Sequence, residues 1–529
     1  MSPLLVILLL IPASGALIGA LLPVAAARSW ALLISAATFV VGLVIALQFN
    51  FHQTAGFQFV FNCAPLPINS SFSLGIDAIS LWLILLTVLL MPLSIAASFE
   101  SIKDRPREYY SWMLLLLAAM LGVFVARDVL VFYVFFELTL VPMFFIIGIW
   151  GGPSRRDAAG KFFLFTFTGS VFTLAGAIYL GYHAQSFNIT DVVSYAQTSL
   201  TNQERYWVLL AFLAGFAVKV PLFPVHTWLP LAHTEAPTAG SVILAGVLLK
   251  LGTYGLIRLA VPIGLLTVNS VAFPHLIHFL GWLCVIGVIY GALVAWVQKD
   301  VKKLVAYSSV SHLGFCVLGM IALNTIGLEG SVLYMINHGL STGAMFLVIG
   351  MIYDRYHTRD IRELSGLARR MPILAFFLVF FVFASIGLPG LNGFVSEFLT
   401  ILGAFTSPYL GIGYGTFAAM GIILGAVYML HMTACVIFGP LKVPGSHGGG
   451  HDEHGHDHAD AETPGDIGAR EIGILIPLAL VVVFLGVYPS GVLRSMNGTF
   501  AEMEQPLNHP QEARVESHAD PANLLVMKP

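Results

Sequence analysis

Four ionisable side chains interrupt segments that are otherwise apolar or aromatic: Glu137, Lys219, Lys250 and Glu397. A charged group at the centre of a bilayer costs at least about 2.5 kcal/mol, so such residues usually serve a function. A carboxylate and an amine held close together in a low dielectric change each other's affinity for protons. We therefore expect Glu137 and Lys219 to form a pair whose making or breaking takes up or releases a proton. The alternative is a static ion pair that fastens two helices, but a buried pair stabilises less than apolar packing does.

The surroundings of the other charges suit proton transfer. Lys219 lies two residues before Pro221 in LAGFAVKVPLFP, where water and carbonyls freed by the proline can solvate its ammonium group. Lys250 closes the apolar run SVILAGVLLK. Glu397 follows the glycine-rich GLPGLNG and is expected to be a terminal that loads and releases protons. The alternative for Glu397 is a position near the membrane interface, pointing at water.

Histidines are candidates for intermediate proton carriers because their ordinary pKa is close to neutrality. His312, in YSSVSHLGFC, and His338, in YMINHGLSTG, fall in adjacent predicted spans among polar side chains that can hold water. His226, in PVHTWLP, is expected on the side where protons enter. By contrast, we expect His233 and Glu235, in LAHTEAP, to be loop residues that cap the next helix.

Long apolar segments must position these residues. The chain has 529 residues, 57% hydrophobic and 10% charged, a composition that excludes a water-soluble enzyme. A helix needs about 20 apolar residues to cross a bilayer, and these runs are too long for the strands of an outer-membrane barrel. The predicted fold class is all-α integral membrane, with about 14 transmembrane helices. The predicted spans are 4–24, 29–50, 77–98, 111–126, 129–150, 162–182, 206–222, 238–262, 273–297, 304–324, 328–353, 372–406, 411–438 and 472–492.

Two of these spans are interrupted. Pro221 and Pro224 remove backbone donors at the end of 206–222, so we expect that helix to be broken. The glycines and proline of 387–393 predict a second break, inside 372–406. Paired broken helices, one in each half of a membrane bundle, indicate an internal inverted repeat whose interrupted helices line an ion path.

The distribution of basic residues predicts the orientation in the membrane. Seventeen Lys and Arg lie in the odd-numbered loops between the predicted spans, and three in the even-numbered loops. Since basic loops stay in the cytoplasm, we expect both termini outside it, on the periplasmic side of a bacterial plasma membrane. The net charge of −3 forms no basic patch, so nucleic acid is not an expected partner.

The remaining motifs argue against metal or redox chemistry in this chain. Its four cysteines show no CxxC spacing, and it contains no P-loop or dinucleotide fingerprint. The segment 445–466, GSHGGGHDEHGHDHADAETPGD, is interpreted as a solvated linker. Transient binding of zinc or nickel is the alternative, although the glycines deny the histidines a fixed ligand geometry.

Four longer stretches stand out: FFELTLVPMFFIIGIWGG, FAVKVPLFPVHTWLPLAHTEAPTAGSVILAGVLLKLGTYG, DVKKLVAYSSVSHLGF and GLPGLNGFVSEF. Together they resemble the antiporter-like membrane subunits of respiratory complex I, the proton-pumping NADH-quinone oxidoreductase, over nearly the whole chain. The resemblance implies fourteen helices with two inverted five-helix repeats. It makes Glu137 and Lys219 the coupling pair, Lys250 the central relay and Glu397 the exit-side residue. Glu397 stands where sister subunits usually carry lysine, and the His-rich segment departs from the family pattern.

The resemblance also implies partners. The chain should hold no cofactor, so NADH, FMN, iron–sulfur clusters and quinone are expected in partner subunits. Other membrane subunits, including sister antiporter-like ones, and the lipid bilayer are the expected neighbours. On this basis the chain divides into N-terminal helices (1–110), two antiporter-like repeats (111–262 and 273–438), a His/Gly-rich cytoplasmic loop (439–471), and a last helix with a polar tail (472–529).

Two other functions remain open at the level of the sequence. A subunit of a multi-subunit sodium/proton antiporter shares the same ancestral module and the same Glu–Lys arrangement. A structural membrane scaffold would use the buried charges only to fasten helices. The FVSEF context of Glu397 argues against the antiporter.

Overall fold

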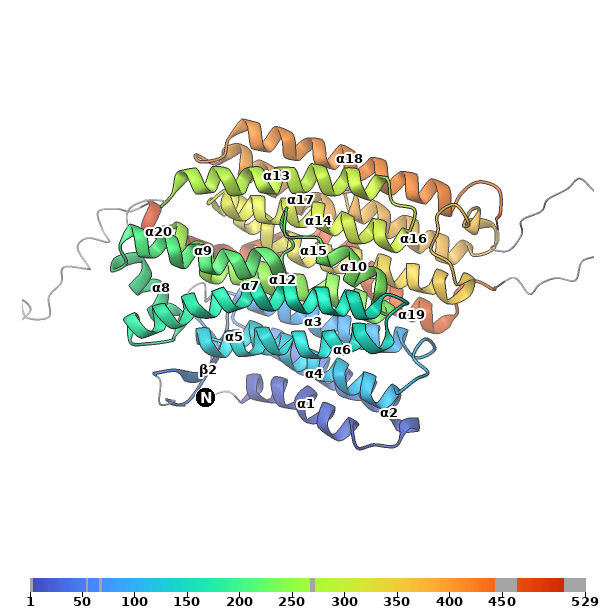
Figure 1. Ribbon diagram of the computed structural model, residues 1–529, viewed down its shortest axis with the longest axis horizontal. Coiled ribbons are helices and arrows are strands. Elements are labelled where there is room, and N and C mark those ends of the chain that lie inside the picture. Colours follow the sequence, from blue (N-terminus) through green and yellow to red (C-terminus); the bar gives the residue numbers. More distant parts are fainter. Residues whose placement is uncertain (1–2, 54–55, 66–68, 267–271, 443–463, 509–529) are drawn as a thin grey trace, which may run out of the picture.

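The computed structural model describes residues 3–53, 56–65, 69–266, 272–442 and 464–508. Most helices run side by side along one direction and form a bundle (Figure 1). The helices are α1 (Leu4–Gly19), α2 (Val24–Gln48), α3 (Ala78–Ala97), α4 (Pro106–Val125), α5 (Val129–Leu138), α6 (Leu140–Trp150), α7 (Arg155–Ala184), α8 (Ile189–Thr198), α9 (Asn202–Lys219), α10 (Trp228–Glu235), α11 (Thr238–Ile243), α12 (Leu249–Gly255), α13 (Pro274–Trp296), α14 (Val301–Ile321), α15 (Thr325–Tyr356), α16 (Pro372–Ser385), α17 (Asn392–Thr406), α18 (Ile412–Val436), α19 (Ala469–Val487) and α20 (Ser490–Asn508). Two π-helical segments, η1 (Leu244–Leu248) and η2 (Leu256–Leu265), extend α11 and α12, and η3 (Leu367–Arg369) is a 3-10 turn.

The helices confirm an all-α multi-pass membrane protein. Among the described residues, 11 helical stretches are long and apolar enough to cross a membrane. They coincide with 11 of the 14 predicted spans. The three others correspond to the short helix α1 and to the two interrupted helices, so the exact number of crossings stays a prediction.

Both predicted breaks are present. The helix α9 ends at Lys219 and the chain resumes as α10 at Trp228, while α16 ends at Ser385 and α17 begins at Asn392. The two broken helices run in opposite directions. Helix α10 ends beside the loop before α7, since Gly152 N–H donates to the Glu235 carbonyl, and α16 begins at that same end of the bundle. This antiparallel relation is the one an inverted repeat requires.

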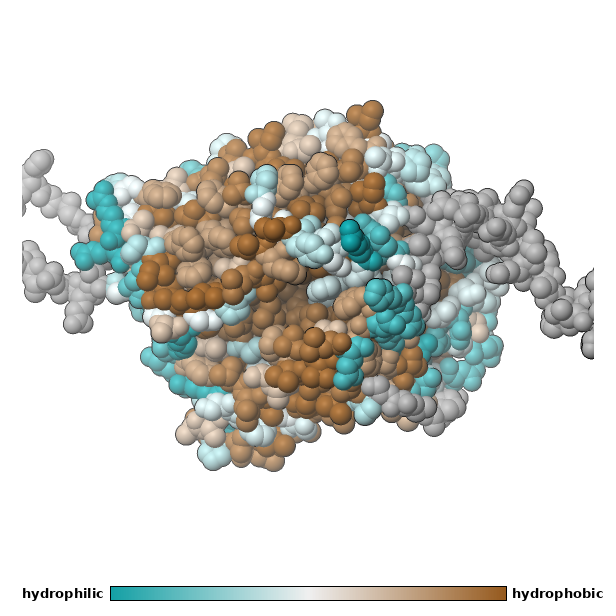
Figure 2. Space-filling view, turned by 180° about the vertical axis from the view of Figure 1, so that it is seen from behind, coloured by the Kyte–Doolittle hydropathy of each residue, from teal (hydrophilic) through white to brown (hydrophobic). Residues whose placement is uncertain are grey.

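The surface divides into an apolar band and two polar ends. Apolar side chains cover the middle of the molecule, and hydrophilic residues gather toward its two ends (Figure 2). We call one of these the basic end, because it carries the odd-numbered loops rich in Lys and Arg. The basic end comprises the described parts of 20–23, 98–105, 151–154, 236–237, 297–300, 357–371 and 437–468.

The centre of the bundle consists of α14, α15 and the stretch from α11 to η2. The most apolar window of each is 94% to 100% buried, against 28% to 50% for several peripheral helices. Lys250, His312 and His338 lie on these three central elements. They are therefore shielded from lipid by the chain itself.

Several elements were not predicted from the sequence. Strands β1 (Gln58–Pro65) and β2 (Ser71–Ile76) form an antiparallel hairpin, and α8 is a short helix before α9. The tail after residue 489, expected to be polar, begins with the amphipathic helix α20. Its buried Val492, Met496 and Phe500 recur every fourth residue, so they lie on one face of the helix and join the core. This apolar face packs against the bundle although the segment as a whole is polar in composition.

Candidate functional site

Lys250 is solvated by the backbone of its own span. The π-helical turn η1 directly precedes α12, and the Lys250 ammonium donates to the Ala245 carbonyl, five residues back. A π-helical turn shifts the backbone hydrogen-bond pattern and leaves carbonyls available, and such turns are frequent at functional sites. The ammonium group also contacts His338 Nδ1 at 2.7 Å. Lys250 is wholly buried, so these two contacts replace its water.

Two glycines bring Lys250 and His338 together. A Cβ at Gly339 would lie 2.7 Å from the Gly246 carbonyl oxygen, which shows that α15 and η1 meet backbone to backbone. Gly246 precedes Lys250 by one helical turn, and Gly339 follows His338 directly. A larger residue at either position would hold the two helices apart.

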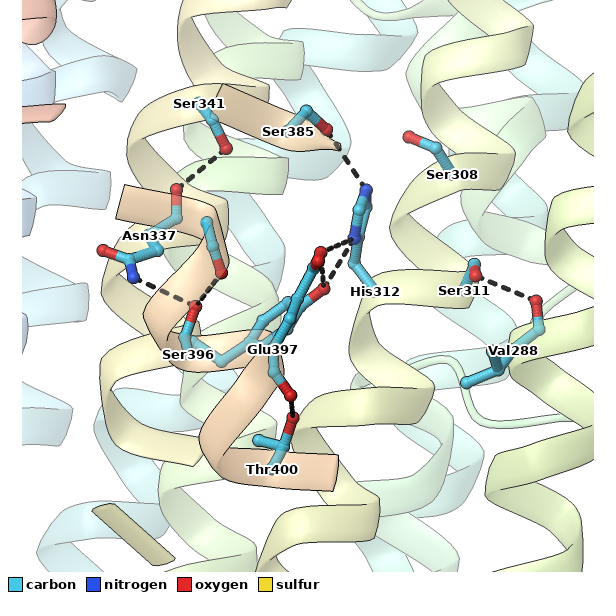
Figure 3. A network of polar contacts seen from close by, with 12 residues as sticks. Val288, Ser308, Ser311, His312, Asn337, Ser341, Ser385, Ser396, Glu397 and Thr400 are labelled. Carbon is cyan, nitrogen blue, oxygen red and sulfur yellow. Dashed lines mark hydrogen bonds and ion pairs between the residues drawn. The ribbon is translucent and has the colours of Figure 1, made fainter. Parts of the chain in front are cut away.

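From His338 the polar side chains continue toward the second break. The His338 and His312 rings lie 5.5 Å apart between centroids. His312 Nδ1 contacts the Tyr334 hydroxyl at 2.7 Å, and this hydroxyl donates to Glu397 Oε1 at 3.0 Å. Figure 3 shows the His312 ring between Ser385 and Glu397. Ser385 Oγ lies 3.3 Å from His312 Nε2. A continuous set of exchangeable protons thus joins His312 to Glu397.

A gap separates this set from the Lys250–His338 contact, because no hydrogen bond joins His338 to His312 among the described residues. A cavity of about 10 Å³ lies there, lined by both histidines, Ser385, Glu397 and neighbouring polar groups. That volume is about the minimum that holds one water molecule. His338 Nε2 is buried without a hydrogen-bond partner among the described residues and is available to such a water.

The second break accommodates the Glu397 carboxylate. Gly387 adopts a φ of +74°, and a Cβ there would collide with Glu397 Oε2. The break is tied to α15, because Asn337 Nδ2 donates to the Asn392 carbonyl at 2.6 Å and to Ser396 Oγ at 3.0 Å. The glycines that predicted a helix break from the sequence therefore also create the space for the carboxylate.

At the first break, Lys219 is held differently from the expectation. Its Nζ donates to Thr139 Oγ1 at 3.3 Å and lies 4.9 Å from the centre of the Phe136 ring and 5.9 Å from that of Phe162. Among the described residues, no ion pair within 4.0 Å joins Lys219 to Glu137, although the two are close enough for their charges to interact. Glu137 Oε1 is buried without a hydrogen-bond partner in the described part of the chain.

The helices that carry Lys219 and Lys250 pack closely against each other, but no bond joins the two side chains among the described residues. A Cβ at Gly252 would lie 3.0 Å from Lys219 Cβ, so α12 packs directly against the end of α9. No hydrogen bond between Lys219 and Lys250 is present in the described residues. His226 lies in the break, buried against Phe223 and Tyr290, and neither of its ring nitrogens has a described partner.

The prediction for His233 and Glu235 was wrong. Both lie inside α10, which continues the broken helix toward the basic end, and neither caps the next helix. Glu235 Oε2 instead accepts from Ser154 N–H at 2.9 Å, directly before α7. His233 is wholly buried.

Tyr334 and Ser385 contact His312 from two sides, and neither was predicted as a site residue from the sequence. The spacing of Tyr334, one helical turn before His338 on a span rich in polar residues, was the available signal. The His-rich segment 445–466 lies almost wholly outside the described residues.

Comparisons with known proteins identify the family of the chain. The family described as NADH:quinone oxidoreductase/Mrp antiporter, TM matches residues 126–435, and the one described as NADH-ubiquinone oxidoreductase chain 4, amino terminus matches residues 17–126. NADH-quinone oxidoreductase subunit M of Rhodobacter capsulatus is 41% identical over 485 residues, which cover 90% of both chains.

Solved structures have the same fold. A chain of respiratory complex I from Thermus thermophilus, solved with bound NADH, superposes with a TM-score of 0.81 at 29% identity and covers 94% of this chain and 99% of that one. A chain of the Mrp complex from a Dietzia species superposes with a TM-score of 0.80 at 21% identity and covers 97% and 100%. At that identity the second likeness shows the fold alone.

The bundle, its two broken helices and the buried charges beside them define an antiporter-like membrane protein. Within this class the extent and level of identity decide the branch. The chain belongs to the family of NADH-quinone oxidoreductase subunit M, called chain 4 in its NADH-ubiquinone oxidoreductase relatives.

Proposed function

We propose that this chain is the proton-translocating membrane subunit of an NADH-quinone oxidoreductase, coupled to quinone reduction elsewhere in the complex. Its family supports the assignment to the complex, and its buried side chains support the transfer of protons. The observation that carries the proposal is the series of buried groups from Lys250 through His338, His312 and Tyr334 to Glu397, with one small cavity between the two histidines. These groups lie in the centre of the bundle, where a static network of this kind would be a costly way to hold helices together.

Protons can pass along this series with each group restored in turn. The Lys250 ammonium gives a proton to His338 Nδ1, and His338 releases one from Nε2 to a water in the small cavity. That water gives a proton to His312 Nε2, with Ser385 Oγ as a neighbouring partner. His312 Nδ1–H then protonates Tyr334 while Tyr334 O–H protonates the Glu397 carboxylate, so that the phenol is regenerated.

Lys250 must then regain a proton from the first half of the chain. We assign this step to Lys219, whose charge interacts with Glu137 without a direct pair. Movement of Glu137 toward Lys219 stabilises the ammonium, and movement away favours release of its proton toward Lys250. Cation–π contacts with the rings of Phe136 and Phe162 stabilise the Lys219 ammonium whether Glu137 is near or distant. His226, which is buried in the same break, is assigned to proton supply.

The energy for this cycle comes from outside the chain in our proposal. NADH, FMN, iron–sulfur clusters and quinone belong to partner subunits, and this chain contributes to oxidoreductase activity as a non-redox subunit. A neighbouring sister subunit would act on Glu137 by a change of charge or position. The bacterial plasma membrane, with both termini on the periplasmic side and the basic end in the cytoplasm, is the proposed location, in line with the basic loops.

The test removes the ammonium at the head of the series. Lys250→Met keeps an unbranched side chain, one atom shorter, but removes its charge and its exchangeable protons. The matched control is Lys299→Met, at an exposed loop position at the basic end. Both variants are examined in the complete complex in inverted membrane vesicles, with assembly checked on native gels, by NADH oxidation with quinone and by proton pumping.

We expect Lys250→Met to assemble but to lose most coupled NADH oxidation and pumping, while Lys299→Met retains both. Native pumping in assembled Lys250→Met would refute the proposal. If NADH oxidation were untouched and only sodium-driven proton exchange were lost, the sodium/proton antiporter would be the correct function. Loss of assembly alone, with native proton transfer per assembled complex, would favour a structural scaffold.

A further inference from the structure

A threonine marks an interruption in the span that carries Glu137. Helices α5 and α6 together form the apolar stretch Val129–Trp150, which is long enough to cross a membrane, and Thr139 lies between the end of α5 and the start of α6. Pro142 has no N–H to donate to the Leu138 carbonyl, one turn back. Prolines are a usual cause of such interruptions. The backbone is therefore irregular within two residues of Glu137.

The contacts of Thr139 fix the orientation of its hydroxyl. The residue is wholly buried. Its Oγ1 donates to the Phe136 carbonyl at 2.7 Å and accepts from Lys219 Nζ at 3.3 Å. A threonine hydroxyl has only one proton to donate. Because that proton is committed to the Phe136 carbonyl, the lone pairs of the oxygen are left for the lysine, from which the hydroxyl accepts.

Thr139 supplies the one side-chain hydrogen bond that Lys219 makes in the described part of the chain. The centres of the Phe136 and Phe162 rings lie 4.9 Å and 5.9 Å from its Nζ. Glu137 forms no ion pair with Lys219 within 4.0 Å among the described residues, and its Oε1 is buried without a described partner. The structure therefore shows the arrangement in which lysine and carboxylate are apart, with a hydroxyl as the partner of the lysine.

A hydroxyl and a carboxylate hold a lysine in different ways. A carboxylate attracts the ammonium group by its charge and so opposes the loss of its proton. A neutral hydroxyl attracts it through a hydrogen bond, and the amine still has N–H groups to donate after one proton has left. The distance of 3.3 Å is longer than the about 2.7 to 2.9 Å of a charge-assisted bond. Thr139 thus keeps the lysine nitrogen in place without retaining its proton.

We infer that Thr139 is a positioning residue for proton transfer from Lys219: its hydroxyl holds the lysine nitrogen in place, in both protonation states, while Glu137 is withdrawn. The inference rests on the proposed function, because it concerns the step by which Lys219 supplies Lys250. When the Lys219 ammonium gives its proton toward Lys250, an N–H of the neutral amine continues to donate to Thr139 Oγ1. The amine takes up the next proton at the same position, and the hydroxyl is unchanged throughout.

The test separates the hydroxyl from the shape of the side chain. Thr139→Val keeps the shape and removes the hydroxyl, whereas Thr139→Ser keeps the hydroxyl and removes a methyl group. Thr87→Val is the matched control, because Thr87 is also wholly buried and its hydroxyl donates to the carbonyl of Leu83 in its own helix at 2.7 Å. The variants are assayed in the complete complex in inverted vesicles beside Lys250→Met, with assembly checked on native gels.

We expect Thr139→Val to lose about threefold to tenfold of coupled NADH oxidation and proton pumping per assembled complex, which corresponds to one hydrogen bond of ordinary strength. Thr139→Ser should restore most of this activity, and Thr87→Val should lose none. A role in packing predicts the reverse order of the two Thr139 variants, because valine fills the site and serine leaves a gap. Native turnover in Thr139→Val, an equal loss in Thr139→Ser, or an equal loss in Thr87→Val would each overturn the inference.

The outcomes also separate the positioning role from the proposed function. If Lys250→Met fails while Thr139→Val turns over as the native complex does, the positioning role is overturned and the relay stands. If Lys250→Met pumps normally, the proposed function fails and the positioning role fails with it.

A further variant covers the case in which Thr139→Val does not assemble. Serine and cysteine share one skeleton, but a thiol is a much weaker hydrogen-bond acceptor than a hydroxyl. Thr139→Cys and Thr139→Ser therefore compare acceptor strength at nearly the same shape. We expect Thr139→Cys to turn over severalfold more slowly than Thr139→Ser in assembled complexes. Equal turnover in the two would overturn the inference.

Discussion

The contact between Gly339 and Gly246 allows a quantitative prediction. In Gly339→Ala the new Cβ would lie 2.7 Å from the Gly246 carbonyl oxygen. An ordinary carbon–oxygen contact is about 3.4 Å, so the two helices must part by about 0.7 Å. The Lys250–His338 contact, 2.7 Å in the native chain, would then lengthen to about 3.4 Å, beyond normal hydrogen-bond length. A hydrogen bond to a charged group is worth about 1.5 to 3 kcal/mol, which corresponds to a tenfold to hundredfold slower transfer.

The control for this change lies one turn further along the same helix. A Cβ at Gly343 would meet Val242 at 3.6 Å and Leu90 at 3.7 Å, which are ordinary contacts. Gly343→Ala should therefore retain native NADH oxidation and pumping, while Gly339→Ala loses both by at least tenfold in assembled complexes. Native activity in both variants would refute the reasoning. Equal loss in both would mean that packing along α15, and not the lysine–histidine contact, limits turnover.

Two further predictions concern the end of the relay. Tyr334→Phe removes the hydroxyl that contacts both His312 and Glu397, and we expect a loss of pumping of at least tenfold with native assembly, measured in inverted vesicles. Gly387→Ala places a methyl group against the Glu397 carboxylate, whereas a Cβ at Gly390, also at positive φ, meets nothing within 4 Å. Both alanines strain the backbone by roughly 1 to 2 kcal/mol and should lower the thermal stability of the complex, but only Gly387→Ala should abolish pumping.

Much of the architecture could be predicted from the sequence because membrane spans leave a strong signal. Apolar length fixed the position of most helices, and Pro221 and the glycines of 387–393 marked both breaks. Charged residues in apolar runs identified Glu137, Lys219, Lys250 and Glu397 as candidates, since each stands out against its neighbours. These signals are local in the chain and need no knowledge of which helices touch.

The partners of these charges could not be predicted, because they depend on contacts between distant helices. Lys219 lies against Thr139 and aromatic rings, while the expected direct pair with Glu137 is absent from the described ion pairs. Tyr334 joins the relay only because α15 faces α17. His233 looked like a loop residue, since the helix α10 has just eight residues and follows a break.

Irregular backbone and buried charge occur together in this chain for a physical reason. A regular helix satisfies its own carbonyls and offers a buried lysine nothing in place of water. Lys219 closes α9 at a break, Lys250 directly follows a π-helical turn whose carbonyl it uses, and Glu397 lies in the first turns after the second break. The π-helical turn gives Lys250 a backbone carbonyl, and the second break gives the Glu397 carboxylate its space. A substitution that made any of these segments regularly helical should therefore impair proton transfer even if the charged residue itself is unchanged.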